Sequence, residues 1–449
     1  MSLSIITAKI AFFIHNELHP AILHAKKQLM SGDLYGVESS MSERMNDLYD
    51  IIIRAILEEA AEALQAAIRQ EAARLGIGGL AERPLQIQIR TGTYITVKSL
   101  YAKRIRKEYT GRRHLLSAYW SIIEGASPAY YRQAGLLGVL CPSFEVAQSV
   151  LSIQGVRCNR DRIQHVCQGL ARHCKFQEAR LSLQKGETVA GKRVLIGVDG
   201  GRTRTRQYTN KVNKDGNKMF ATPWAEPKLF VIEVLDDEGN IKRTELPLYG
   251  CRFGDDDVIA LLSSYLSALK IEQAACVQVV ADGATWIWNR LRPLLESLGV
   301  AADKIVETLD YYHASQYVHK IIQALPKHLE NIAAQTLKTC KTLLWEGKIQ
   351  DMLGQLQPLF KKPSEEVTRY FGYFTKNLCR MKYQQYRDQK LVCGSGVVES
   401  GVRRVINLRF KSSSSFWKTD NVEGLFFLRG IFLAFRWDTM ICNIVQTKC

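Results

Sequence analysis

Two apolar runs of this sequence each end in an aspartate that is followed by glycine. Residues 194–198 lead to Asp199, and residues 275–281 lead to Asp282. In an α/β sheet, functional side chains gather where strands end and loops open. Asp-Gly after a strand can also be a simple turn. Two such acids on neighbouring strands, however, would lie close enough to share divalent cations.

The chemistry of that pair is phosphoryl transfer. Carboxylate oxygens suit Mg²⁺ or Mn²⁺, which bind through a few carboxylates and keep room for phosphate oxygens. Two such ions about 3.5–4 Å apart can activate a water or a 3′-hydroxyl and stabilise the leaving oxygen. Asp199 and Asp282 therefore predict a two-metal site with Mg²⁺ or Mn²⁺ as the cofactor.

A two-metal site usually needs a third acid, and the C-terminal region offers two glutamates. Glu399 follows a glycine loop at 394–396 and lies one helical turn before Arg403. A weak surface ion pair between Glu399 and Arg403 is the alternative interpretation. Glu423 lies near the start of an apolar helix, where capping by Asn421 and the helix dipole account for it. We therefore expect Glu399 to be the third acid.

Arginines stand beside both the first and the last acid. Those after Asp199 alternate strictly: Arg202, Arg204 and Arg206. If the strand continues, they lie on one face, where planar guanidiniums could bind successive phosphates of a nucleic acid. A solvent-exposed edge strand kept soluble by its charge is the alternative. Arg403 and Arg404 follow Glu399 and place further phosphate-binding groups beside it.

Four segments together resemble bacterial insertion-sequence transposases of the DDE class, closest to the ISKra-type and ISLre-type groups related to Mutator-like elements. They read "GVDGGRTRTR", "VVADGATWIWN", "LDYYHASQYVHK" and "CGSGVVESGVRRVINLRFK". The resemblance covers the chain from about residue 115 to its C-terminal end. It implies an α/β, RNase H-like catalytic domain whose last acid follows a helical insertion. By position, the triad is Asp199, Asp282 and Glu399.

The resemblance also implies a role for an acid-x-x-His pair, Asp310 and His313. In the Mutator-like branch this pair accompanies the triad, so we include His313 among the candidate catalytic residues. A histidine beside a strand end is otherwise more often a local hydrogen-bonding residue. Relatives often carry paired cysteines after the N-terminal hairpin, but residues 99–116 have none, so we expect no zinc site there.

The elements that would position these residues begin at about residue 192. From there strands and helices alternate in the order β-β-β-α-β-α-β-α, which predicts an α/β domain with a mixed sheet. The second and third strands are expected to be joined by a turn at 236–240. Asp256 and Asp257 are expected to cap the first helix. Residues 326–388 are helical in pattern and fit the insertion.

The N-terminal part of the sequence has helical spacing over 41–76 and a period-two hairpin pattern over 85–99. Residues 101–113 then carry six basic side chains against one acid, either a phosphate contact or a solvated face: Lys103, Arg104, Arg106, Lys107, Arg112 and Arg113.

Two short helical patterns fill residues 143–170, with Ser143 and Asn159 as their expected caps. Val146, Val150 and Leu151 are expected to line the first helix. The pair fits a helix-turn-helix with Arg160 and Arg162 at the start of a recognition helix, although an ordinary helical hairpin fits equally.

Composition limits the class of partner. The net charge of +17 favours a polyanion, and double-stranded DNA is preferred over a membrane surface. Lys9 and His15 interrupt the N-terminal apolar run, and Arg429 interrupts the one at 422–435, so no membrane span is expected. Eleven scattered cysteines without a CxxC pair indicate reduced thiols in a cytoplasmic protein. The family implies a bacterial, nucleoid-associated location.

The expected organisation has five parts: an N-terminal helical region with a β-hairpin at 1–114, a helix-turn-helix-like DNA-binding region at 115–185, an RNase H-like core at 190–325, a helical insertion at 326–390, and the end of the catalytic domain at 391–449. The leading function is a DNA transposase that nicks element ends and joins the 3′-OH to target DNA. Through the family, it would act as a homo-oligomer on DNA. The alternatives are a nuclease of the same fold limited to hydrolysis and a domesticated, non-enzymatic DNA-binding protein.

Overall fold

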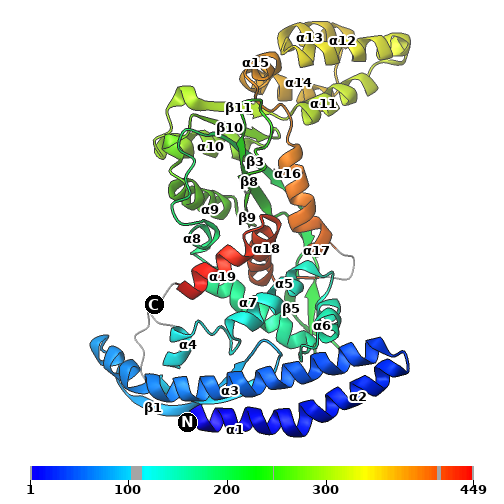
Figure 1. The fold of residues 1–449 in the computed structure, drawn as a ribbon. Coiled ribbons are helices and arrows are strands. Elements are labelled where there is room, and N and C mark those ends of the chain that lie inside the picture. The colour runs from blue at the N-terminus through cyan, green and yellow to red at the C-terminus, as the bar shows by residue number, and fades with distance from the viewer. Residues whose placement is uncertain (1–2, 103–113, 246, 412–415, 447–449) are drawn as a thin grey trace. The chain divides into compact units, whose positions relative to one another are not determined.

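The computed structural model describes the chain except for residues 1–2, 103–113, 246, 412–415 and 447–449 (Figure 1). The basic run 103–113 therefore lies outside the described residues. The chain divides into two compact units, one formed by residues 1–175 with 440–449 and the other by residues 176–439.

The first unit begins with long helices: α1 (Leu3–Phe13), the π-helix η1 (Ile14–Leu18), α2 (His19–Met30) and α3 (Leu34–Arg74). α3 starts earlier than the apolar spacing predicts because Asp33 caps it, its Oδ1 accepting from the Gly36 N–H at 2.8 Å. The expected hairpin is confirmed as β1 (Leu80–Gln88) and β2 (Tyr94–Ala102). Its apolar face packs on α3 in one core, which includes Ile87, Ile95 and Ile68.

Shorter helices complete this unit: α4 (Leu115–Tyr119), α5 (Pro128–Leu140), α6 (Phe144–Ile153) and α7 (Arg160–Cys174). Both expected caps are confirmed. Ser143 Oγ accepts from the Val146 N–H at 3.2 Å, and Asn159 Oδ1 accepts from the Arg162 N–H at 2.8 Å. The expected buried face of α6 is wrong at Val146, which is 41% exposed, because Phe144, Ala147 and Leu151 face the core instead.

The second unit contains a five-stranded mixed sheet in the order β11-β10-β3-β8-β9. Its strands are β3 (Arg193–Gly200), β8 (Lys228–Leu235), β9 (Leu248–Arg252), β10 (Cys276–Ala281) and β11 (Ile305–Leu309). On one side of β3, β8 pairs antiparallel with β3 and β9 pairs antiparallel with β8. On the other side, β10 and β11 run parallel to β3. For the strands of this sheet the expected order of strands and helices is confirmed, with α9 (Asp255–Ala268), α10 (Thr285–Ser297) and α11 (Tyr311–Gln323) between and after them.

Three local expectations are wrong. The first strand does not continue through the alternating arginines, because β3 ends at Gly200. The chain then forms the short strands β4 (Thr203–Arg204), β5 (Gln207–Val212), β6 (Lys218–Ala221) and β7 (Trp224–Ala225). The turn at 236–240 forms, but β9 starts only at Leu248, so a longer connection follows it. Asp256 and Asp257 do not cap α9, whose N-cap is Gly254; they lie in its first turn, where the helix dipole favours acids.

The remaining helices belong to the expected insertion and the C-terminal region. The first group is η4 (Lys327–Ile332), α12 (Ala333–Trp345), α13 (Ile349–Leu356), η5 (Gln357–Leu359), α14 (Glu365–Lys376), η6 (Leu378–Arg380) and α15 (Tyr383–Asp388). The second is α16 (Gly396–Gly401), the π-helix η7 (Val402–Asn407), α17 (Leu408–Phe410), α18 (Thr419–Leu433) and α19 (Trp437–Gln446). The second unit also holds α8 (Glu178–Ser182), η2 (Ile271–Gln273) and η3 (Ala302–Lys304).

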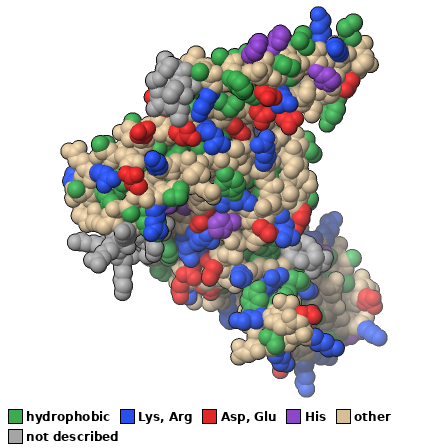
Figure 2. Space-filling model, turned by 90° about the horizontal axis from the view of Figure 1, so that it is seen from below, with side chains coloured by type: hydrophobic (Ala, Val, Ile, Leu, Met, Phe, Trp, Pro, Cys, Tyr) green, Lys and Arg blue, Asp and Glu red, His purple; other side chains and the backbone are tan. Residues whose placement is uncertain are grey.

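Three properties of the described residues bear on the sequence predictions. None of their helices combines the length and apolarity that a membrane span needs. Their ten cysteines are free. On the face that Figure 2 shows, lysine and arginine side chains are spread widely, with acidic side chains between them.

A buried carboxyl group lies beneath the C-terminal helices. Glu233 on β8 is 7% exposed, and its Oε2 has no hydrogen-bond partner among the described residues. Burial raises the pKa of Glu233 from 4.5 to about 7, although the nearby guanidiniums of Arg404 and Arg436 oppose the shift. Arg404 also donates to the Tyr249 hydroxyl at 2.6 Å.

We predict that Glu233→Gln removes a pH-dependent loss of stability. Because the folded-state pKa is raised, the folded chain binds more protons than the unfolded chain between about pH 4.5 and pH 7. The free energy of unfolding therefore falls as the pH rises through that window. At pH 8 the variant should be more stable than the wild type by on the order of 2–3 kcal/mol, and at pH 4 the two should be similar.

Urea denaturation at pH 4, 6 and 8 measures the difference. Glu238→Gln is the matched control, because that side chain is 71% exposed. Equal pH slopes for the wild type and Glu233→Gln would contradict the prediction.

Candidate active site at the strand ends

The register of three parallel strands sets three aspartates side by side. Val198 of β3 lies opposite Ala281 of β10, and Ala281 lies opposite Leu309 of β11. Each of these residues is followed by an aspartate: Asp199, Asp282 and Asp310. Neighbouring strands lie about 4.8 Å apart, so the three acids follow one another across the C-terminal ends of these strands. We call them the strand-end row.

Backbone N–H groups orient the first two acids of the row. Asp199 Oδ1 accepts from the Gly200 N–H at 2.7 Å, and Asp282 Oδ1 accepts from the Ala284 N–H at 2.9 Å. The Trp288 indole fixes the loop after β10 by donating to the Asp282 carbonyl at 2.8 Å. Both carboxyl groups are half-buried, and each is held through one of its oxygens.

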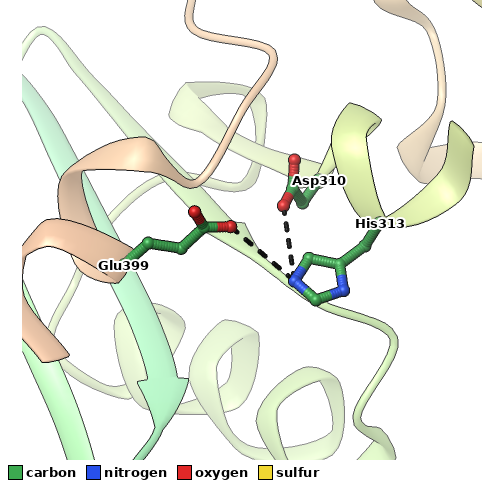
Figure 3. A group of neighbouring side chains, drawn as sticks. All are labelled: Asp310, His313 and Glu399. Carbon is green, nitrogen blue, oxygen red and sulfur yellow. Dashed lines mark ion pairs between the residues drawn. The ribbon is translucent and has the colours of Figure 1, made fainter. Parts of the chain in front are cut away.

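The third acid of the row is fully buried and tied to Glu399. Asp310 caps α11, with Oδ1 accepting from the Tyr312 N–H at 2.9 Å. The Ser395 hydroxyl lies 2.6 Å from Asp310 Oδ2 and 3.1 Å from Glu399 Oε1, so it links the two carboxyl groups. His313 Nε2 lies 3.7 Å from Asp310 Oδ2 and 3.8 Å from Glu399 Oε1 (Figure 3).

Close packing of α16 on the sheet brings Glu399 to the row. A Cβ built at Gly197 of β3 would lie only 2.9 Å from the Val398 Cβ. One built at Gly401 would lie 2.9 Å from Val231 Cγ2 on β8. A glycine in the strand and another in the helix therefore allow the two to approach this closely. The Glu399 side chain remains 51% exposed.

The competing glutamate lies elsewhere. Glu423 Oε1 accepts from the Phe253 N–H at 3.0 Å, and its helix α18 packs on β9, the edge strand farthest from β11. The expectation that Asn421 caps α18 is wrong, because the N-cap is Lys418 and Asn421 lies inside the helix. Of the two candidates, Glu399 is the one that the structure brings to the strand-end row.

Electrostatics couples four of these groups. Burial raises the pKa of Asp199 to about 6, while its hydrogen bond from the Gly200 N–H opposes the shift. The charges of Asp282 and Glu399 raise it further, whereas His313 lowers it. Several carboxyl groups thus crowd a partly dehydrated site that has one imidazole. A bound divalent cation would relieve their mutual repulsion.

The donor groups fit a divalent cation. One ligand atom from each of Asp310, His313 and Glu399 lies within 4.8 Å of the others. Asp199 and Asp282 end the neighbouring strands but do not belong to that group, so the cluster differs from the predicted set of Asp199, Asp282 and Glu399. Carboxylate oxygens suit Mg²⁺ and Mn²⁺, while the imidazole of His313 favours a transition metal.

Near the row, side-chain burial still alternates along residues 202–206, as expected for a strand, although β3 ends at Gly200. Arg202 is exposed, whereas Thr203 and Thr205 are buried. Two of the three guanidiniums lie over aromatic rings, Arg204 over Trp224 at 4.9 Å and Arg206 over Phe220 at 4.3 Å.

Beyond Glu399, Arg403 is exposed, but Arg404 is half-buried and bonded to Tyr249. Among the described residues, Glu399 forms an ion pair with His313 and not the alternative one with Arg403. DNA contact by these arginines remains a prediction.

The arginines of the helix-turn-helix candidate belong to the first unit and have local partners. Arg160 pairs with Asp161 at 2.8 Å and with Glu145 at 3.3 Å. Arg162 Nε donates to Gln88 Oε1 on β1 at 2.7 Å. Base reading by Arg160 and Arg162 remains a prediction.

Sequence analysis missed Ser395 and included Asp310 only through the family resemblance. The rule that selected Asp199 and Asp282, an aspartate directly after an apolar strand, also applies to Asp310 after β11. That signal was present, but only the family resemblance drew attention to it. The linking role of Ser395 depends on the fold and has no local sequence signal.

Comparisons with known proteins add little to this geometry. No family model matches the chain, and no curated protein matches it. Among solved structures, the chain is similar to the Drosophila P element transposase strand transfer complex, with 11% identity and a TM-score of 0.34 over 70% of this chain and 93% of that chain. A likeness of this size does not establish the fold. The resemblance to ISKra-type and ISLre-type transposases has no sequence match behind it.

We predict that Ser395→Ala weakens metal binding. Without the hydroxyl, Asp310 and Glu399 lose their link, and second-shell losses of this kind typically cost about 10- to 100-fold in metal affinity. We expect Mn²⁺ affinity to fall by at least about 10-fold in a calorimetric titration. Ser400→Ala is the matched control, because Ser400 is exposed on α16, the helix that Ser395 directly precedes. Equal Mn²⁺ affinities for both folded variants would show that Ser395 does not position the ligands.

Proposed function

We propose that this protein is a DDE-class DNA transposase with an RNase H-like catalytic sheet. The observation that carries the proposal is the strand-end row, to which the Ser395 hydroxyl links Glu399 of α16. The sheet order supports the RNase H-like assignment, because the first strand is central, the second and third continue antiparallel, and the fourth and fifth run parallel to it. The membership that we propose is the ISKra-type or ISLre-type group.

In this proposal Asp199, Asp282 and Glu399 hold Mg²⁺ or Mn²⁺ in a two-metal site. The bound metal would stabilise charge on the phosphate oxygens and lower the pKa of the attacking hydroxyl or water. His313 lies near the scissile phosphate and can hold or pass a proton at Nε2, the atom that faces Asp310 and Glu399. The buried Asp310 carboxyl group lies 3.7 Å from the same nitrogen.

The proposed partner is double-stranded DNA, both element ends and target. The net charge of +17 supports this partner, and exposed arginines beside the acids can bind the phosphates near the reacting one: Arg202 and Arg403. Pairing of two element ends would require a homo-oligomer on DNA. With membership of the bacterial group that we propose, the location would be the cytoplasm, at the nucleoid.

The test is strand transfer with a donor duplex carrying the inverted repeats that flank the gene. We predict that Asp199→Asn, Asp282→Asn and Glu399→Gln each reduce Mg²⁺-dependent cleavage by about 10³-fold or more, equivalent to about 4 kcal/mol in the barrier. DNA affinity should change little, because each substitution removes a metal ligand and keeps its shape. Glu423→Gln is the matched control and should cut normally.

The outcomes separate the alternatives. Cleavage without strand transfer by the wild type would indicate the nuclease, and binding without cleavage would indicate a non-enzymatic DNA-binding protein. If Glu399→Gln cuts while Glu423→Gln does not, the assignment of the third acid is wrong.

A further inference from the structure

Along the chain, a two-stranded β-ribbon is inserted between β3 and β8, the first two strands of the sheet. β5 and β6 pair antiparallel, with Tyr208 opposite Phe220 and Val212 opposite Lys218. Apart from Thr209, every residue of both strands is exposed, so both faces of the ribbon meet solvent. A solvated two-stranded ribbon is marginally stable by itself. The ribbon therefore needs stabilising contacts at its base (its root), at its tip, or with a partner.

The root of the ribbon is anchored to the segment before α18. Arg206 N donates to the Trp417 carbonyl at 2.8 Å. The Phe220 ring lies 6.0 Å from that of Phe416, and the Lys418 ammonium lies 5.4 Å from the centre of the Tyr208 ring. These contacts hold the base of the ribbon in place.

The tip of the ribbon is also ordered. Asn213 Oδ1 accepts from the Asp215 N–H at 3.1 Å and the Asn217 N–H at 2.8 Å, and Asn213 N donates to the Asn217 carbonyl at 2.8 Å. With contacts at both its base and its tip, the exposed strands between them form a defined projection.

The projection is basic. Residues 207–221 carry three lysines and one acid: Lys211, Lys214, Lys218 and Asp215. Within the described chain, none of these lysines is among those that form ion pairs. Apolar side chains lie between them, with Val212 62% and Met219 46% exposed. Positive charge interspersed with exposed apolar groups on a narrow ribbon fits a polyanion that also offers apolar edges.

We propose that the β5–β6 ribbon enters the major groove of duplex DNA. That groove is about 12 Å wide and admits a two-stranded β-ribbon, whose strands lie about 4.8 Å apart. Lys211, Lys214 and Lys218 contact phosphates at the groove walls, and the apolar side chains meet base edges such as thymine methyl groups. The proposal rests on the proposed function for its partner, DNA, but it does not depend on catalysis.

The test uses the full chain with Lys211, Lys214 and Lys218 all changed to Gln. The probe is a 30-base-pair duplex, and affinity is measured by fluorescence anisotropy from 50 to 200 mM salt. Each lost phosphate contact lowers the slope of log K against log salt by about 0.9, so we expect a reduction of about 2.7. Affinity at 100 mM salt should fall by at least about 10-fold.

The matched control replaces three exposed lysines of the helical insertion, which are Lys361, Lys362 and Lys376. This control removes the same charge and should keep the wild-type slope. Methylation of guanine N7 by dimethyl sulfate reports on the major groove directly. The wild type should protect guanines at its site, and the ribbon variant should lose protection at those guanines that the ribbon covers.

The outcomes distinguish this proposal from the proposed function. If the wild type transfers strands while the ribbon variant keeps its salt slope and its guanine protection, the ribbon proposal is wrong and the function stands. If the wild type never cuts but the variant loses slope and protection, the ribbon proposal stands and the function fails. A slope that falls equally in both triple variants, or unchanged methylation, would also overturn insertion into the groove.

Discussion

The candidate site depends on the shared register of β3, β10 and β11. Parallel strands must be joined by crossover connections, and α9, α10 and their loops return the chain so that each strand ends at the same sheet edge. A slip of one residue would move an aspartate to the opposite face of the sheet. The hydrophobic core enforces the register, because Val198, Ala281 and Leu309 are all buried directly before their acids.

Two further elements are fitted against that row. α16 approaches the sheet closely enough that Gly197 and Gly401 leave no space for a β-carbon. The helical insertion reaches the other side through Tyr373, whose ring occupies the space that a Cβ at Gly283 would need. Burial raises the pKa of Tyr373, and the charges of Asp282 and Asp310 raise it further, so this ring lies within electrostatic reach of the acids. The insertion therefore helps to shape the site.

Much of this fold could be predicted from local patterns. Continuous apolar runs identified β3 and β10, and the acids directly after these two strands were recognised by the same reading. The predictions that failed concern the strands β4 to β7 and the start of β9. The strands β4 to β7 are short and mostly exposed, so they lack the apolar signal of buried strands. β9 was misplaced because a turn forms at 236–240 without a strand directly after it.

The sequence already favoured Glu399 over Glu423 as the third acid, but it did not show where either helix packs. In the structure α16, which carries Glu399, packs on β3 and β8, whereas α18, which carries Glu423, packs on β9. The partners of Arg404 and Arg162 lie 155 and 74 residues away in the chain, so no local pattern could indicate them.

The central claim is that the strand-end row and Glu399 form a divalent-metal site. Anomalous diffraction from a crystal soaked in MnCl₂ tests it most directly, because manganese is located without any assumption about catalysis. We predict anomalous peaks in contact with Asp199 and Asp282, with Glu399 as a shared ligand. If manganese binds only at other surfaces, or if these carboxyl groups remain metal-free at saturating Mn²⁺, the account of the site is wrong.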